Sequence, residues 1–384
     1  MSSFFIGVLS VFFLLYGTVS YYVGLRLGQA FHSMIAPYEL LYWAGYIIVV
    51  ISPFAARFGK SYFPGSLKDR ITLLGDYWLA AIYYFTLLWA LTDLLNLMAA
   101  TFSLTTGSYP SPITGSIIVV LVALLLLYGS WNARHPRIKQ YDITIDKLVP
   151  GLPKLHAVMV SDIHLGVVVG NERLEEMVHR INTLKPDIVF FAGDTIDEDV
   201  RIFVERKMPQ VLAKLQPSYG VFAVLGNHEY IGGNSQLAIE YLQQAGVTVL
   251  VDQVVKVNNQ FYVAGRNDRM AVNIHGTERL DLAGLMVGIN QELPVILLDH
   301  QPYKLEEGQC NGVDLQLSGH THNGQFFPNN FITRHIFEKD WGYVRKGDYQ
   351  AIISCGFGTW GPPIRIGNHP EIIDIAITFK QDKK

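Results

Sequence analysis

The sequence predicts an α/β domain that follows an all-α, four-helix transmembrane region, and three observations indicate this. At 384 residues the chain is longer than one typical domain, so we expect two. Only 16% of the residues are charged, against roughly 25% in an average soluble protein, and the first third is almost bare of charge. From about Lys147 onward, short apolar runs alternate with helical patterns, which is typical of a sheet with helices on its faces.

Four apolar stretches in the first third reach the length of about 20 residues that a membrane-spanning helix needs. They are Phe4 to Val23, Tyr38 to Arg57, Tyr77 to Phe102 and Ile113 to Trp131. A cleaved signal peptide is the alternative for the first stretch, but it lacks a basic n-region and three further spans follow it. We therefore expect a transmembrane region over residues 1–133, a linker and domain entry over 134–153, and a second domain over 154–384.

Basic residues in the short loops predict the orientation of the spans, because such residues are enriched on the cytoplasmic side. They lie after span two and after span four: Arg57, Lys60, Lys68, Arg70, Arg134, Arg137 and Lys139. Both segments fall on the same side of a four-span topology. We expect a multi-pass plasma-membrane protein whose C-terminal domain is cytoplasmic.

Asp93 lies inside the third predicted span. A carboxylate is costly there, which makes it a candidate functional residue. The alternative is that Asp93 lies near an interface, or hydrogen-bonds to a neighbouring helix through a polar group such as Asn96.

The second domain shows strands and helices in alternation. Apolar residues at helical spacing indicate helices at Glu172 to Leu184, Val200 to Leu215 and Ser235 to Ala245. Apolar runs indicate strands at Leu155 to Ser161, Asp187 to Ala192, Val221 to Leu225, Val247 to Val251, Phe261 to Ala264, Val295 to Leu298, Val313 to Ser318, Ala351 to Ser354 and Ile372 to Thr378. Ligands of such sheets gather in the loops beyond the carboxyl ends of the strands.

Carboxylate, amide or imidazole side chains follow five of these strands. In chain order the segments are Asp162-Ile163-His164, Gly193-Asp194-Thr195-Ile196-Asp197, Gly226-Asn227-His228-Glu229, Asp299-His300 and Gly319-His320-Thr321-His322. Residues two apart in an extended segment point to the same face, so Asp162 and His164 can reach one ion, and so can His320 and His322. The five segments therefore predict a ligand site at one end of the sheet.

This ordered set resembles the signature of the calcineurin-like metallophosphoesterases, which runs Asp-x-His, Gly-Asp-x-x-Asp, Gly-Asn-His-Asp/Glu, a lone His and Gly-His-x-His. The resemblance covers the chain from about Lys154 to its end and not the membrane region. It implies a sandwich of two β-sheets flanked by helices. It also implies one metal ion held by Asp162, His164 and His322, a second held by Asn227, His300 and His320, and Asp194 as the bridge between them.

The other predicted site residues lie beside these ligands. The resemblance makes His228 the general acid that protonates the leaving oxygen, with a structural role as the alternative. Asp197 and Glu229 are interpreted as carboxylates that orient the imidazoles or the loop. Arg266 and Arg365 are candidates for binding a phosphate oxygen, with a surface salt bridge or a tight turn as the alternative. Related bacterial membrane-associated members have a Gly-x-Gly-Thr-Trp-Gly-Pro-Pro-x-Arg loop similar to the one that ends at Arg365.

These ligands contain no thiolate and suit two divalent ions such as Mn, Fe or Zn. Two ions would clamp the phosphoryl oxygens, and the hydroxide that bridges them would attack phosphorus in line. We therefore expect a membrane-anchored hydrolase of a phosphomonoester or phosphodiester, with a membrane lipid or a small soluble diester as candidate substrates. The alternatives are a membrane scaffold or sensor that uses the domain as a ligand-binding module, and a transporter with an accessory domain. A net charge of -3 gives no indication of nucleic-acid binding, which is typical of basic chains.

Overall fold

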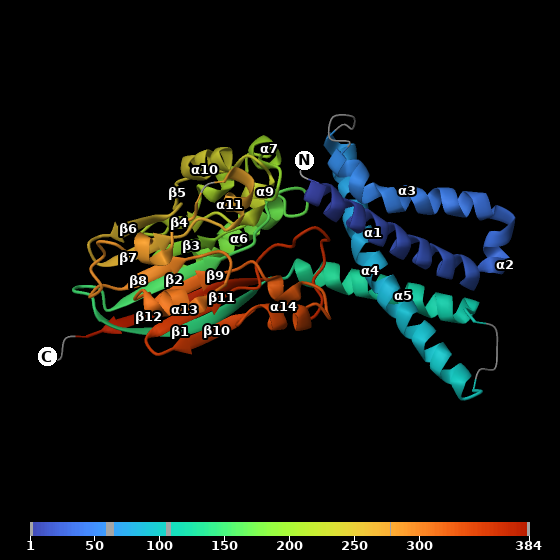
Figure 1. The fold of residues 1–384 in the computed structure, drawn as a ribbon. Helices are drawn as coiled ribbons and strands as arrows, with labels where there is room; N and C mark the ends of the chain where they lie inside the picture. The colour runs from blue at the N-terminus through green and yellow to red at the C-terminus, as the bar shows by residue number, and fades with distance from the viewer. Residues whose placement is uncertain (1–2, 59–64, 105–108, 277, 382–384) are drawn as a thin grey trace. The chain divides into compact units, whose positions relative to one another are not determined.

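The computed structural model describes residues 3–58, 65–104, 109–276 and 278–381, and the chain divides into two units (Figure 1). Unit 1 comprises Met1–Ser130 and Gly361–Pro363, and unit 2 comprises Trp131–Trp360 and Ile364–Lys384. The helices of the N-terminal part are α1 (Ser3–Ala30), α2 (His32–Ile35), α3 (Glu39–Phe58), α4 (Gly65–Thr101) and α5 (Pro112–Ala133). The end of α5 belongs to unit 2.

Four helical segments among the described residues are long and apolar enough to cross a membrane, as the sequence predicts. They are Ser10–Ala30, His32–Ala55, Gly65–Thr101 and Pro112–Ala133. The third differs in its start, because α4 begins at Gly65 and not near Tyr77. Lys68 and Arg70, expected in a loop, therefore lie in the first turns of α4, while Lys60 lies outside the described residues.

Asp93 of α4 is paired with α1. Its Oδ2 accepts hydrogen bonds from the Tyr22 hydroxyl at 2.6 Å and from Arg26 Nη2 at 2.7 Å, and its Oδ1 accepts one from Tyr109. Arg26 lies within α1, which extends past the predicted end of the first span. The hydrogen bond to a neighbouring helix is thus confirmed, with Arg26 and Tyr22 as partners in place of Asn96, and the ion pair offsets the cost of the carboxylate.

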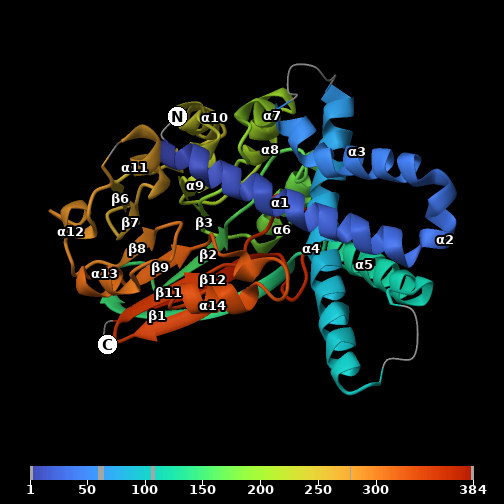
Figure 2. The same ribbon diagram turned by 45° about the vertical axis from the view of Figure 1, so that its right-hand side comes forward.

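Unit 2 is a sandwich of two six-stranded mixed sheets, as the fold class requires (Figures 1 and 2). The first sheet has the order β1 (Arg137–Leu148), β12 (Glu371–Lys380), β2 (Lys154–Val160), β3 (Ile188–Ala192), β4 (Val221–Val224) and β5 (Val247–Val249). The second has the order β10 (Gly342–Lys346), β11 (Tyr349–Ile353), β9 (Leu315–Ser318), β8 (Val295–Leu298), β7 (Phe261–Gly265) and β6 (Gln253–Val257). Strands β2 to β5 are parallel, and so are β11, β9, β8 and β7.

Alternation along the strands divides the core into layers. Ala157 and Met159 of β2 face the space between the sheets, whereas Val158 and Val160 face helices on the outer side. The helices on that outer side include α6 (Asn171–Leu184), α7 (Val200–Glu205), α8 (Met208–Leu212), α9 (Asn227–Ile231), α10 (Ser235–Gln244) and α11 (Met270–His275), while α12 (Leu282–Leu285) and α13 (Leu305–Cys310) pack on the second sheet. Because both faces of the central strands are buried, these strands are continuous apolar runs in the sequence.

The structure differs from the sequence-based expectation at the sheet edges and in one helix. Strands β1, β6 and β10 were not predicted, and β1 lies in the stretch expected to be a linker and domain entry, where it pairs in parallel with β12. The predicted helix from Val200 to Leu215 is two helices, because Lys207 has a φ of 55° and Pro209 follows in the first turn of α8. The five ligand segments also divide between two sheets, three after β2, β3 and β4 and two after β8 and β9.

Candidate metal centre

The backbone turns sharply where three of the five segments leave their strands, after β2, β3 and β9. Asp162, His164, Asp194, His320 and His322 all have positive φ, between 49° and 73°. Each such non-glycine residue costs about 1 kcal/mol or more, and structures retain this strain mainly at functional sites. The turn after β3 also needs its glycine, because Gly193 has a φ of 89° and a Cβ there would overlap the His300 ring.

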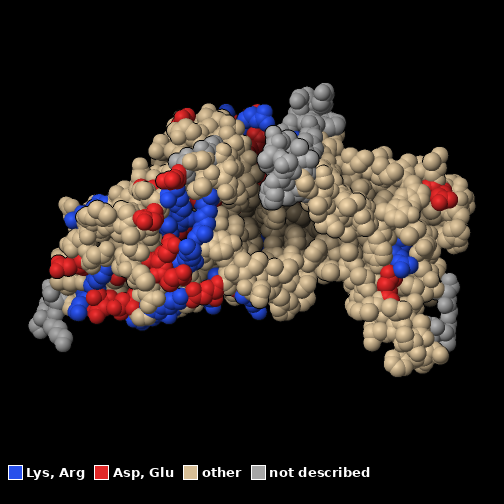
Figure 3. All heavy atoms as spheres, in the orientation of Figure 1, with Lys and Arg blue, Asp and Glu red and all other residues tan. Residues whose placement is uncertain are grey.

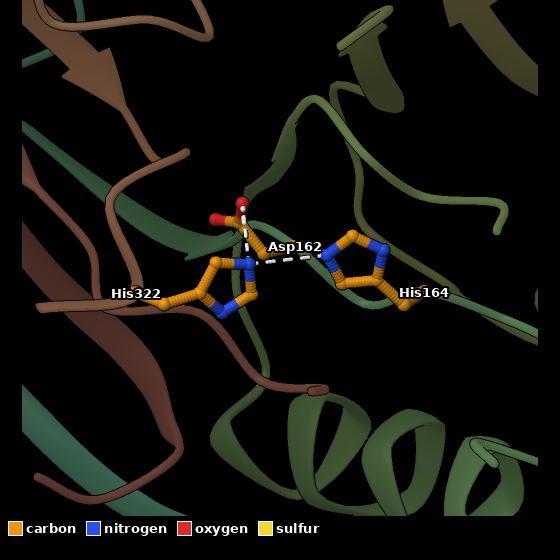
Figure 4. A group of neighbouring side chains, drawn as sticks. All are labelled: Asp162, His164 and His322. Carbon is orange, nitrogen blue, oxygen red and sulfur yellow. Dashed lines mark hydrogen bonds and ion pairs between the residues drawn. The ribbon is translucent and has the colours of Figure 1, made fainter. Parts of the chain in front are cut away.

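Asp162, His164 and His322 form the first group of side chains that could hold a metal ion. Figure 4 shows the two imidazoles turned toward each other with the carboxylate beside them. Nε2 of His164 lies 3.2 Å from Nε2 of His322, which in turn lies 3.4 Å from Oδ1 of Asp162. All three residues are buried, so the sequence motifs Asp-x-His and Gly-His-x-His meet here.

Asp194 connects this group to a second one. Its Oδ2 lies 3.9 Å from Nε2 of His164 and 3.2 Å from Nε2 of His300. Asp194, His300 and His320 form a further group that could hold an ion, and Nδ1 of His320 lies 2.8 Å from Oδ1 of Asn227. The Asp194 carboxylate therefore lies within reach of both groups.

Burial sets the protonation of most imidazoles in the site. It lowers the pKa of His164 to about 4 and that of His320 to about 3, and it lowers the pKa of His322 as well. These rings are therefore neutral at pH 7 and keep a lone pair for a cation. His300 differs, because Asp194 and Asp162 overcome the effect of burial and raise its pKa well above the usual range. An ion that binds His300 must displace that proton.

The donor atoms fit a bound divalent cation. Two neutral imidazole nitrogens face each other at 3.2 Å across the first group, where either a ring N–H or a shared cation can lie between them. Nε2 of His300 is buried and makes no well-directed hydrogen bond among the described residues, and the Asp194 carboxylate lies 3.2 Å from it, although buried polar atoms are normally satisfied. Imidazole, amide and carboxylate donors suit borderline or hard divalent ions.

His228 and two carboxylates border these groups. The His228 backbone N–H donates to Oδ1 of Asp194 at 2.9 Å, and its Nδ1 lies 3.2 Å from Oδ1 of Asp197. Burial opposes protonation, but Asp194 and Asp197 outweigh it and raise the pKa of His228 to about 9. Glu229 accepts hydrogen bonds from the backbone N–H of Ile196 at 2.9 Å and of Gly226 at 2.8 Å, so it ties together the loops that follow β3 and β4.

The family of this chain follows from its similarity to known proteins. The model of the family described as calcineurin-like phosphoesterase matches residues 155–324. An uncharacterized metallophosphoesterase of Aquifex aeolicus is 35% identical over 263 residues, which are 68% of this chain and 98% of that protein. The chain belongs to the calcineurin-like phosphoesterase family. The family depends on two metal ions, and the clustered His and Asp side chains of unit 2 are candidates for holding them.

Two proteins of Danio rerio are also similar to this chain. A Danio rerio protein named transmembrane protein with metallophosphoesterase domain is 31% identical over 275 residues, and the chain spans 62% of its length. The crystal structure of a dimetal phosphatase from Danio rerio matches 60% of this chain and 100% of its own, with 15% identity and a TM-score of 0.34.

The two arginine candidates of the phosphoesterase domain are bound to protein groups, and neither lines the cleft that opens beside the candidate metal centre. Arg266 Nη1 lies 2.8 Å from Oε2 of Glu307 and 3.2 Å from Oδ2 of Asp299, which Arg279 also contacts. Arg365 is fully buried, and its guanidinium donates to the backbone oxygens of Cys355, Gly356 and Gly358. Its Nη2 also lies 3.2 Å from Nδ1 of His322, the ring nitrogen that does not face His164 and Asp162.

A cleft of about 510 Å³ opens onto the candidate metal centre. Asp194, Asn227, His228, His320 and His322 line its inner part. Trp360 also lines the cleft and belongs to the glycine-rich loop that the sequence singled out, whereas sequence reasoning did not single out Glu198, Ile231, Ile332 or Phe337. Ile332 lies on α14 (Asn330–Ile336), a helix too short for its apolar spacing to stand out in the sequence.

Proposed function

We propose that unit 2 is a dinuclear metal-dependent hydrolase of a phosphomonoester or phosphodiester. The position of Asp194 carries this proposal, because its carboxylate lies within 3.9 Å of His164 on one side and 3.2 Å of His300 on the other. One ion would be held by Asp162, His164 and His322, and the other by Asn227, His300 and His320, with Asp194 shared. Manganese, iron and zinc all suit these donors.

The side chains around the ions have distinct tasks in this proposal. Two bound ions would neutralise charge on the phosphoryl oxygens and would provide hydroxide near neutral pH. His228 lines the cleft and gives its proton to the oxygen of the leaving group. Asp197 contacts Nδ1 of His228 and orients its ring. Glu229 positions the loops that follow β3 and β4, and Arg365 contacts Nδ1 of His322.

The four apolar helices support anchoring of this hydrolase in a membrane, and a phosphoester in the same membrane is then the first substrate to consider. A small soluble phosphodiester is the other substrate class. The fold itself does not choose between them.

Removal of metal tests the proposal. Detergent-purified protein should hydrolyse bis(p-nitrophenyl) phosphate or p-nitrophenyl phosphate with added manganese, lose the activity to a chelator, and regain it when manganese returns. The preferred ester distinguishes a diesterase from a monoesterase. Turnover that survives chelation would contradict the metal-dependent mechanism, and folded, metal-loaded protein with no turnover on these esters or a lipid phosphoester panel would favour a ligand-binding module.

We also infer that the catalytic domain is cytoplasmic, in a multi-pass plasma-membrane protein. The inference rests on basic residues that precede α4 or begin it and on those that follow α5: Arg57, Lys68, Arg70, Arg134, Arg137 and Lys139. In sealed, right-side-out membrane vesicles, the C-terminal domain should resist added protease until detergent is present. Cleavage of the domain in intact vesicles would reverse the orientation.

A further inference from the structure

Apolar side chains are exposed in the outer part of the cleft and on the helix α14, which contributes Ile332 to its lining. They are Ile231 at 46%, Phe331 at 59%, Ile332 at 58%, Ile336 at 54% and Trp360 at 55% exposure, and together we call them the apolar lip. In Figure 3 the surface around α14 is mainly tan, whereas charged side chains gather over the neighbouring strands. Exposed apolar side chains that cluster at a cleft are typical of a binding surface.

The apolar lip is continuous with the metal centre. Ile231, Ile332 and Trp360 line the same cleft as Asp194 and His228. The Trp360 ring lies 6.2 Å, centre to centre, from the His228 ring, and Gln325 holds the Trp360 backbone through hydrogen bonds of 2.9 Å and 3.0 Å. A long molecule whose phosphoester reaches the metal ions can therefore lay its remaining part against these three apolar side chains.

The charge of the cleft limits what that molecule can be. Among the described residues that line it, none is Lys or Arg, and the acidic side chains are Asp194 and Glu198. A second phosphate, as in a nucleotide with a polyphosphate chain, would find no guanidinium or ammonium group there, and the His228 imidazole is already assigned to the leaving group. The lining therefore favours a phosphoester whose remaining part is apolar.

The anchoring of the chain points to the same substrate class. The last apolar helix ends at Ala133, and β1 begins at Arg137, so only residues 134–136 separate a candidate membrane span from the catalytic sheet. A hydrolase held this close to a span works where lipids are concentrated.

We propose that the apolar lip binds the hydrocarbon tail of a lipid phosphoester while the ester group reaches the metal centre. The proposal rests on the phosphoesterase function proposed above. Each methylene that leaves water gains about fourfold in binding, so the tail contributes to kcat/KM in proportion to the length that the lip covers.

The test uses two phosphodiesters that share a p-nitrophenyl leaving group and carry either an ethyl or an octyl second ester. Full-length protein in one fixed concentration of nonionic detergent should prefer the octyl ester in kcat/KM by roughly sixtyfold if three of the six additional methylenes are covered. The double variant Phe331→Asp, Ile336→Asp places charge on the lip, and both side chains are mostly exposed, so the core keeps its packing. We expect it to reduce the octyl-to-ethyl ratio by at least about tenfold.

Val287→Asp is the matched control, because Val287 is 80% exposed and does not line the cleft. It should keep the wild-type ratio, and partition of the octyl ester into micelles cancels in this comparison. An equal ratio in the double variant and the control would overturn the tail site, even with both esters hydrolysed. If neither ester is hydrolysed faster by wild type than by Asp194→Asn, the phosphoesterase function itself fails, and the tail site with it.

Discussion

Asp194→Asn should lower turnover of any phosphoester by about a thousandfold or more, which corresponds to about 4 kcal/mol of transition-state stabilisation. The carboxylate lies between His164 and His300, and a neutral amide cannot bridge two cations with the same strength. The substitution keeps the shape of the side chain, so the hydrogen bond from the His228 backbone N–H retains an oxygen acceptor. The measurement is kcat with manganese present at saturation.

Asp142→Asn provides the control for this change. Asp142 is exposed on β1 and lies outside the site, so its loss of charge should leave turnover within about twofold, as is usual for surface substitutions. Circular dichroism should show the same fold for both variants and wild type. Asp194→Asn that retained turnover within a few fold of wild type would exclude a bridging role for this carboxylate.

His228→Ala should have an effect that depends on the leaving group. General acid catalysis contributes about 10²–10⁴-fold when the leaving oxygen needs a proton. An alkyl ester needs that proton, whereas p-nitrophenolate leaves readily without it. We therefore expect turnover of an alkyl phosphodiester to fall by about a thousandfold and that of bis(p-nitrophenyl) phosphate to fall much less.

This difference separates the catalytic role of His228 from a structural one. If His228 only supported the Asn227 segment, the variant would lower turnover of both esters by the same factor. His179→Ala, at an exposed position on α6, should change neither. An equal loss on both esters would therefore contradict the proton-donor role.

The ligand segments were predictable because each follows a strand that is buried on both faces. Such strands, as in β3 and β8, leave an uninterrupted apolar run in the sequence, and the polar residues that follow, such as Asp194 and His300, are then conspicuous. Parallel strands also bring their carboxyl ends to one edge. What the sequence alone did not show was that the segments come from two sheets, which only the family resemblance implied.

Other features depend on contacts between distant residues and left no local pattern. The partner of Asp93 is Arg26, 67 positions away in the sequence. Arginine often binds phosphate, yet the guanidinium of Arg365 donates its hydrogen bonds to three backbone carbonyls and to Asn368. The first half of the edge strand β1, residues 137–142, has no buried side chain, and the helix α14 that carries part of the apolar lip is only seven residues long.

The number of divalent ions bound per chain tests the dinuclear centre most directly. Detergent-purified wild type, equilibrated with manganese and then freed of unbound metal, should contain two ions per chain by elemental analysis, and His228→Ala should contain two as well. Asp194→Asn should contain at most one, because each ion loses the shared carboxylate. One ion or none in folded wild type, or two in Asp194→Asn, would contradict a centre built around Asp194.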